Sequence, residues 1–184
     1  MAKLVPQTHP ALHAIAEEVP VEDITSPRIQ KILKDMRAAL HSYKAAEYVG
    51  LAIAAPQIGV PLRIFLVEDL QKKKKDAAKA DPPHLPSLVA INPRILRLSK
   101  KKQLMHEGCL SVKDVYGGVT RSTHATIRAY DERGTPYERG ASGLLAQIFQ
   151  HEVDHLDGIL FVDRAEEILH PEEIATHRRA QTAV

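Results

Sequence analysis

The chain has 184 residues, of which 44% are hydrophobic, and a formal net charge of +2. This length and apolar content predict one compact domain with a core of its own. The charge is too small to argue for a nucleic-acid partner, and no DNA partner is expected. No apolar run is long enough to cross a bilayer, and the N-terminus lacks a signal-peptide pattern.

The first half of the chain contains signals for one helix and two strands. Ser26-Pro27 is typical of a helix start, because serine caps the free backbone N–H groups and proline fits the first turn. The helix that follows has an apolar stripe, formed by Ile29, Ile32, Leu33, Met36 and Leu40. Residues 62–67 and 88–95 are rich in branched side chains and predict strands.

Two loop segments flank these strands. Gly50 to Gly59 combines small residues with Gln57 and predicts a close-packed turn between a helix and a strand. Residues 71–86 form a polar insert with four consecutive lysines, Lys72–Lys75, which favours a solvated loop. Contact with ribosomal RNA is the alternative, both for this insert and for Lys100–Lys102.

The second half predicts a hairpin over residues 122–140, turning at Asp131-Glu132-Arg133-Gly134. Strands separated by unequal gaps, with helices grouped at the ends, indicate an α+β fold. We expect a catalytic domain over residues 1–165 and a C-terminal tail over 166–184, in which Pro171 to Val184 is a candidate short helix. Arg178-Arg179 in this tail is a second candidate for weak ribosome contact.

His151-Glu152-Val153-Asp154-His155 is the strongest chemical signal in the chain. Residues four apart lie on one face of a helix, so both imidazoles can reach one metal ion while Glu152 lies beside it as a proton carrier. Upstream, Ser142 is a candidate N-cap, and Leu144, Leu145 and Ile148 recur at helical spacing. Gly158 is a candidate helix end.

A catalytic metal site needs a third protein ligand, and several candidates exist. The position of the third histidine in metzincin proteases is Phe161, which cannot bind metal, whereas Glu172 or Glu173 could complete a thermolysin-like site. Cys109, the only cysteine, lies in a short segment typical of a strand or tight loop, and its alternative role is packing in the core. A fourth protein ligand would instead close the site and make the metal structural.

Three segments in the same order resemble peptide deformylase. They are Ala54-Ala55-Pro56-Gln57, Glu107-Gly108-Cys109-Leu110-Ser111 and Gln150-His151-Glu152-Val153-Asp154-His155. His9 to Leu12 and Asp157 to Arg164 are also similar to that family, so the likeness covers residues 4–165. The implied fold has the metal helix surrounded by antiparallel sheets.

The resemblance implies removal of the formyl group from the N-terminal methionine of newly made proteins, with release of formate. It assigns Cys109, His151 and His155 as ligands of one divalent metal, with Fe²⁺ expected in cells and Zn²⁺, Ni²⁺ or Co²⁺ as alternatives. The metal activates a water molecule, and Glu152 carries its proton.

The resemblance also implies how the transition state and the substrate are held. The side-chain amide of Gln57 and the backbone N–H of Leu110 would bind the oxyanion. Candidates for the methionine slot are Leu110, Leu144 and Ile148, and extended chain near Leu51, Ala52 and Gly108 would pair with the peptide backbone.

Two positions depart from the family pattern. Ala52 stands where glycine is usual, and Lys113 stands where proline is common, so they affect peptide affinity and loop shape rather than chemistry. The expected partners are N-formyl-methionyl nascent peptides, and the absence of paired cysteines agrees with a reducing, cytoplasmic location.

Overall fold

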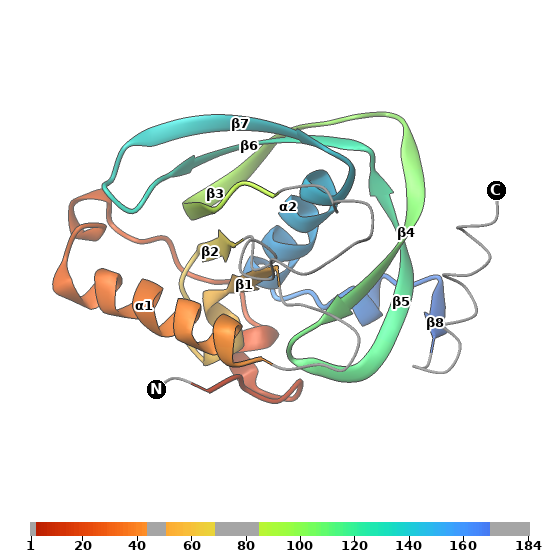
Figure 1. Ribbon diagram of the computed structural model, residues 1–184, viewed down its shortest axis with the longest axis horizontal. Helices are drawn as coiled ribbons and strands as arrows, with labels where there is room; N and C mark the ends of the chain where they lie inside the picture. The colour runs from red at the N-terminus through yellow and green to blue at the C-terminus, as the bar shows by residue number, and fades with distance from the viewer. Residues whose placement is uncertain (1–2, 44–50, 69–84, 170–184) are drawn as a thin grey trace, which may run out of the picture.

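The computed structural model describes residues 3–43, 51–68 and 85–169 of the chain (Figure 1). Its helices are α1 (Pro27–Ser42) and α2 (Gly143–Leu156), with short 3-10 helices at Pro10–Leu12, Val21–Asp23, Ala55–Ile58 and Phe161–Asp163. Its strands are β1 (Ala52–Ala54), β2 (Ile64–Val67), β3 (Leu88–Leu98), β4 (Lys102–Cys109), β5 (Val112–Ser122), β6 (His124–Tyr130), β7 (Pro136–Ser142) and β8 (Glu167–Leu169).

The strands form two antiparallel sheets. One has five strands in the order β1-β2-β3-β6-β7, and the other has three in the order β4-β5-β8. Figure 1 shows α2 crossing the centre of the molecule, where it contacts strands of both sheets. This arrangement confirms the predicted α+β fold with a central helix among antiparallel sheets.

Helix α1 confirms the prediction made from Ser26-Pro27. The Ser26 hydroxyl accepts a hydrogen bond from the Ile29 backbone N–H at 3.4 Å, and Pro27 opens the first turn. The apolar stripe packs against β1 and β2. Its members Ile29, Leu33, Met36 and Leu40 are buried, while Ile32 is only partly buried.

The predicted strands are present with shifted ends. Strand β2 begins at Ile64 because Leu62 instead forms an isolated bridge with Glu17. Strand β3 runs on to Leu98, which pairs with Ala125 of β6. The β6–β7 hairpin turns where predicted, and the Asp131 carboxylate accepts hydrogen bonds from the backbone N–H groups of Arg133 and Thr135.

Helix α2 confirms the predicted metal helix. Ser142 occupies the N-cap position, although its side chain makes no capping hydrogen bond. After the helix, Gly158 has a φ of +75°, and a Cβ there would lie 2.9 Å from the backbone of His13. Glycine at this position therefore lets the chain leave the helix close to the N-terminal segment.

Some expectations fall on residues that the structure does not describe: the lysine run Lys72–Lys75, the candidate helix from Pro171, and Arg178-Arg179. Leu85, within the expected polar insert, is buried in the core. Glu167–Leu169, within the expected tail, forms β8 and pairs with β5. No helix in the described part of the chain is both long and apolar enough to cross a membrane.

Candidate metal centre and active site

The thiol of Cys109 and the imidazoles of His151 and His155 converge at one point. Cys109 ends β4, and the two histidines lie one turn apart on α2. Their ligand atoms all lie within 4.8 Å of one another, and Cys109 Sγ is 3.3 Å from His155 Nε2. The structure therefore brings together the three side chains that the sequence proposed as one ligand set.

The local geometry at Cys109 depends on a tight connection between β4 and β5. Cys109 pairs with Val112 across the two residues Leu110 and Ser111, while the neighbouring pair is Gly108 with Tyr116. A Cβ at Gly108 would lie 2.8 Å from the Tyr116 ring, so any side chain there would displace that ring. Glycine therefore allows the close packing of the strand that positions the thiol.

A buried ion network behind the histidines orients His151. His151 Nδ1 lies 2.8 Å from Glu107 Oε2. Arg121 donates from Nε and Nη2 to the two oxygens of Glu107 at 2.8 and 2.9 Å, and from Nη1 to Asp154 Oδ2 at 2.6 Å. Because Nδ1 of His151 is engaged, its Nε2 is the nitrogen left to face the cluster.

The sequence analysis missed this network. Glu107 and Asp154 lie inside the quoted motifs, so their positions beside the ligands were a usable signal. Arg121 lies in β5, twelve residues after Cys109 in the chain, and no pattern in the sequence links it to the site. Arg121 reaches Glu107 and Asp154 only because β5 packs against α2 in the folded structure.

The network sets the charge state of Glu107. Burial alone would raise the pKa of this carboxyl, but hydrogen bonds from Arg121 and His151, with their positive charges, lower the pKa to about 2. Glu107 is therefore an anion throughout the physiological range. A fixed anion behind His151 raises the basicity of that ring as a ligand.

The pKa values of the Cys109 thiol and the His151 imidazole are both shifted from their ordinary values. Burial would raise the pKa of the Cys109 thiol, but the charge of His155 and hydrogen bonds from His151 and His155 lower the pKa to about 5. Burial would lower the pKa of His151, yet its bonds to Cys109 and Glu107 hold that pKa well above the ordinary value. The cluster thus holds a thiolate beside an imidazolium, whose proton a cation can replace.

Glu152 is in a different environment from Glu107. It is only 4% exposed, and its Oε2 has no hydrogen-bond partner in the described part of the chain. Burial is the largest cause that raises its pKa, to about 7. A carboxyl with a pKa near neutrality can both accept and return a proton at physiological pH.

The residues present fit a divalent transition metal. A thiolate with two imidazole nitrogens is a known three-ligand catalytic set. No further cysteine, histidine, aspartate or glutamate belongs to this group among the residues described. His155 directs its Nε2 at the thiol, and its Nδ1 is buried without a hydrogen-bond partner in the same part of the chain.

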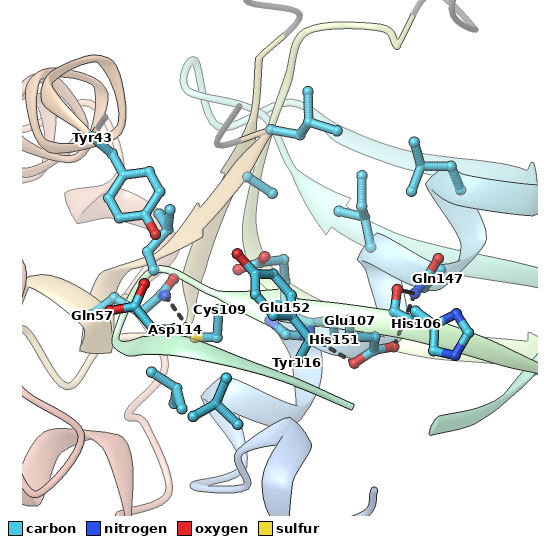
Figure 2. Close-up of a pocket in the computed structure, with 18 residues that line it drawn as sticks. Tyr43, Gln57, His106, Glu107, Cys109, Asp114, Tyr116, Gln147, His151 and Glu152 are labelled. Atoms are coloured by element: carbon cyan, nitrogen blue, oxygen red, sulfur yellow. Dashed lines mark hydrogen bonds and ion pairs between the residues drawn. The ribbon is translucent and has the colours of Figure 1, made fainter. Parts of the chain in front are cut away.

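Gln57 lies against the cluster in a fixed orientation. Its Oε1 accepts a hydrogen bond from the Ala54 backbone N–H at 2.8 Å, so its Nε2 points at Cys109 Sγ, 3.4 Å away (Figure 2). The backbone N–H of Leu110, the residue after Cys109, has no backbone acceptor among the residues described. The Leu110 N–H and the second N–H of the Gln57 amide are therefore available to donate to a ligand beside the thiol.

A cavity of about 200 Å³ opens beside the cluster (Figure 2). It gathers every site residue that the sequence proposed except His155, which is 1% exposed and is not among the lining residues. These lining residues are Leu51, Ala52, Gln57, Gly108, Cys109, Leu110, Leu144, Ile148, His151 and Glu152. The cavity also includes residues that sequence reasoning missed, namely Tyr43, His106, Glu107, Val112, Asp114, Val115, Tyr116 and Gln147.

The sequence offered other positions for the third metal ligand, at Phe161 and at Glu172 or Glu173. Phe161 is 1% exposed and its ring stacks on His151 at 6.3 Å between centroids, so it supports the ligand ring without binding metal. Glu172 and Glu173, the thermolysin-like alternative, lie outside the described residues. Cys109 is not merely a packing residue, because its Sγ contacts His155 and Gln57.

Residues 1–170 match the family model described as polypeptide deformylase. The chain is 41% identical over 169 residues to peptide deformylase 1A, chloroplastic/mitochondrial, of Arabidopsis thaliana, covering 89% of this chain and 61% of that protein. It is 44% identical over 116 residues to the peptide deformylase of Desulforudis audaxviator, covering 63% and 67%. The chain spans about three fifths of the length of the plant relatives it matches.

Solved structures agree with these sequence matches. A class I type b peptide deformylase from Acinetobacter baumannii with Met-Ala-Ser bound has a TM-score of 0.74 and 32% identity, covering 88% of this chain and 96% of that one. The actinonin-bound form of that enzyme has a TM-score of 0.75 and 31% identity, covering 90% and 99%.

Proposed function

Because the chain belongs to the peptide deformylase family, we propose that it hydrolyses the N-formyl group of formyl-methionyl peptides and releases formate. The observation that carries this proposal is the joint placement of Cys109, His151 and His155 at one edge of a cavity, with Glu152 beside them. Nascent proteins that begin with formyl-methionine are the proposed substrates.

The resident ion is proposed as Fe²⁺, with Zn²⁺, Ni²⁺ and Co²⁺ as alternatives, because mixed nitrogen and sulfur sites do not select among these ions by affinity. Cys109, His151 and His155 would hold it. When bound, such an ion polarises the formyl carbonyl and lowers the pKa of water toward neutrality.

Glu152 is the proton carrier in this proposal. Its pKa of about 7, raised by burial, lets it take a proton from the attacking water and return it to the departing amine. Its unpaired Oε2 supplies the accepting atom. The same side chain therefore acts in both halves of the reaction.

Gln57 and Leu110 would stabilise the oxyanion that develops on the formyl carbonyl. The hydrogen bond from the Ala54 N–H to Gln57 Oε1 holds the side chain in place, so Gln57 Nε2 does not have to reorient during the reaction. The Leu110 N–H is the second donor. Each donor of this kind lowers the barrier by about 3 kcal/mol.

Apolar side chains and strand edges would bind the peptide. Leu110, Leu144 and Ile148 line the cavity and are the proposed slot for the unbranched methionine side chain. Strands β1 and β4 are each at the edge of their sheets, and Ala52 and Gly108 on them line the cavity. A peptide that lies between these edges can pair through its backbone, which suits substrates of varied sequence.

Of the two departures from the family pattern, Ala52 lines this cavity and Lys113 does not. Ala52 lines it, so its methyl group narrows the space beside β1. Lys113 is exposed and is not a lining residue. We therefore propose that Ala52, and not Lys113, affects how closely the peptide backbone approaches.

Weak ribosome association and a cytoplasmic location complete the proposal. Lys100–Lys102 are exposed and follow the end of β3, where they are available to phosphate groups. A single cysteine agrees with a reducing compartment.

The proposal is tested with the iron-loaded protein prepared without oxygen and formyl-Met-Ala-Ser as substrate. We expect formate and Met-Ala-Ser in equal amounts, with the internal peptide bonds intact. Release of Met or Ala-Ser would favour a peptidase, and retention of metal without formate would favour a structural site. Loading the same preparation with Zn²⁺, Ni²⁺ or Co²⁺ ranks the candidate ions.

A further inference from the structure

Strand β5 contains a bulge beside the metal centre. Val112 pairs with Cys109 and Tyr116 pairs with Gly108, so the three residues between them, Lys113 to Val115, have no partner on β4. At the middle of this bulge, Asp114 has a φ of +56°. Bulges next to active sites re-aim side chains, and this one places Asp114 on the wall of the cavity.

Asp114 is an exposed acidic residue on the wall of this cavity, whereas Glu152, which also lines it, is 4% exposed. Among the residues that the structure describes, no lysine or arginine lines the cavity. Glu107 is neutralised by Arg121 and His151, and His106 pairs with Glu167 of β8. Asp114 is exposed and makes no hydrogen bond or ion pair with any residue that the structure describes.

Tyr43 lies on the side of the cavity near Asp114. Figure 2 shows its ring, from the end of α1, with the hydroxyl directed toward the region where Asp114 and Gln57 lie. Burial raises the pKa of Tyr43, and the carboxylate of Asp114 and the thiolate of Cys109 raise it further, which places all three groups within electrostatic range. A phenol kept neutral can donate to a peptide carbonyl and does not itself compensate the Asp114 charge.

From this arrangement we infer that Asp114 selects for a basic side chain at one of the two residues that follow the formyl-methionine. The inference rests on the proposed function, because it concerns peptides bound with their formyl end at Cys109, His151 and His155. A lysine or arginine on the peptide gains an attraction to the exposed carboxylate of Asp114, while a glutamate is repelled. An exposed pair of this kind corresponds to a preference of about 3- to 5-fold.

A purely conformational role for Asp114 is the competing explanation. Aspartate and asparagine both tolerate positive φ better than most residues, so the bulge itself could account for the residue. The substitution Asp114→Asn separates the two roles, because it keeps the shape and the positive φ and removes only the charge. Asp23→Asn is the matched control, since Asp23 is exposed and does not line the cavity.

The experiment measures kcat/KM for formyl-Met-Lys-Ala, formyl-Met-Ala-Lys and their glutamate counterparts. In the unaltered protein and in Asp23→Asn, the lysine peptide of at least one pair is preferred about 3- to 5-fold or more, and high salt reduces the preference. In Asp114→Asn the lysine-to-glutamate ratio falls at least about 3-fold, while kcat/KM for formyl-Met-Ala-Ser stays within about 2-fold. Equal ratios in Asp114→Asn and the unaltered protein would overturn the inference.

A second readout does not depend on turnover. Competition binding of the unformylated peptides Met-Lys-Ala and Met-Glu-Ala, and of Met-Ala-Lys and Met-Ala-Glu, reports the same preference in the metal-loaded protein. If no peptide yields formate, the proposed function fails, but a lysine preference in binding that disappears in Asp114→Asn still supports the charge selection. Binding without any such preference would contradict the selection whether or not formate is released.

Discussion

Glu107 and His151 are joined by a contact of 2.8 Å between Oε2 and Nδ1, buried beneath the metal centre. One residue comes from β4 and the other from α2, so this contact ties the sheet to the helix that supplies two ligands. Arg121 on β5 donates hydrogen bonds both to Glu107 and to Asp154 on α2, so β5 is joined to the same helix. These hydrogen bonds therefore help to fix the position of His151 relative to Cys109.

Replacing Glu107 by Gln should weaken metal binding by about 10- to 100-fold, because the anion that orients His151 and raises its basicity is lost. Competition with a chromophoric chelator measures the affinity. Glu138→Gln serves as the control, since Glu138 pairs with Arg128 on the surface. Unchanged affinity in Glu107→Gln would show that His151 needs no orienting anion.

The acid stability of the metal-free protein should depend on Glu107. Its pKa is about 2 in the folded state, against an ordinary value of 4.5. Because the folded state binds fewer protons in this interval, the stabilisation is fully present above pH 4.5 and is lost as the pH falls toward 2. The loss amounts to about 3 kcal/mol.

Urea unfolding of the metal-free protein at several pH values between 6 and 3 measures this effect. Glu107→Gln is expected to be less stable at pH 6, since Arg121 loses its partner, but to lose less stability on acidification. Parallel curves for the two proteins would assign the acid sensitivity to other carboxyls.

Metal binding at pH 7 should release about one proton per ion, because Cys109 is already a thiolate with a pKa of about 5 whereas the pKa of His151 is raised well above its ordinary value. Affinity should then fall about tenfold per pH unit below pH 7, and more steeply below pH 5, where the thiol is also protonated. Calorimetry in buffers of different ionisation enthalpy counts the protons. Release of two protons would show that the thiol is protonated in the metal-free protein.

Two substitutions separate metal binding from proton transfer. Cys109→Ala should lose the metal and all turnover, because two imidazoles alone are a weak site. Glu152→Ala should keep the metal and lose turnover by about 10²- to 10⁴-fold, because the proton carrier is gone. Metal analysis beside formate assays checks both variants, and full turnover in Glu152→Ala would contradict its assigned role.

Gln57→Ala should lower kcat by about 10²- to 10³-fold with the metal retained, because one oxyanion donor is removed. Gln103→Ala is the control, since Gln103 is exposed on β4 and does not line the cavity. A change confined to KM in Gln57→Ala would indicate that this amide binds substrate and transition state equally.

Local patterns in the chain were sufficient for much of the fold and the site. The Ser26-Pro27 start and the stripe from Ile29 to Leu40 predicted α1, and the turn at Asp131 predicted the β6–β7 hairpin. The His151 and His155 spacing placed both rings on one helix face, since helical geometry is a local property. The three motifs together indicated Cys109 as the partner of these rings.

The tertiary structure alone decided what supports and surrounds these residues. The partnership of Arg121 with Glu107 and Asp154 arises from the packing of β5 against α2, which no spacing in the chain encodes. The bulge at Asp114 depends on the register between β4 and β5, and register is set by long-range pairing. The sequence by itself thus determined the reacting groups, because they lie within short helical or turn segments, while the packing of distant strands decided their charge, orientation and cavity.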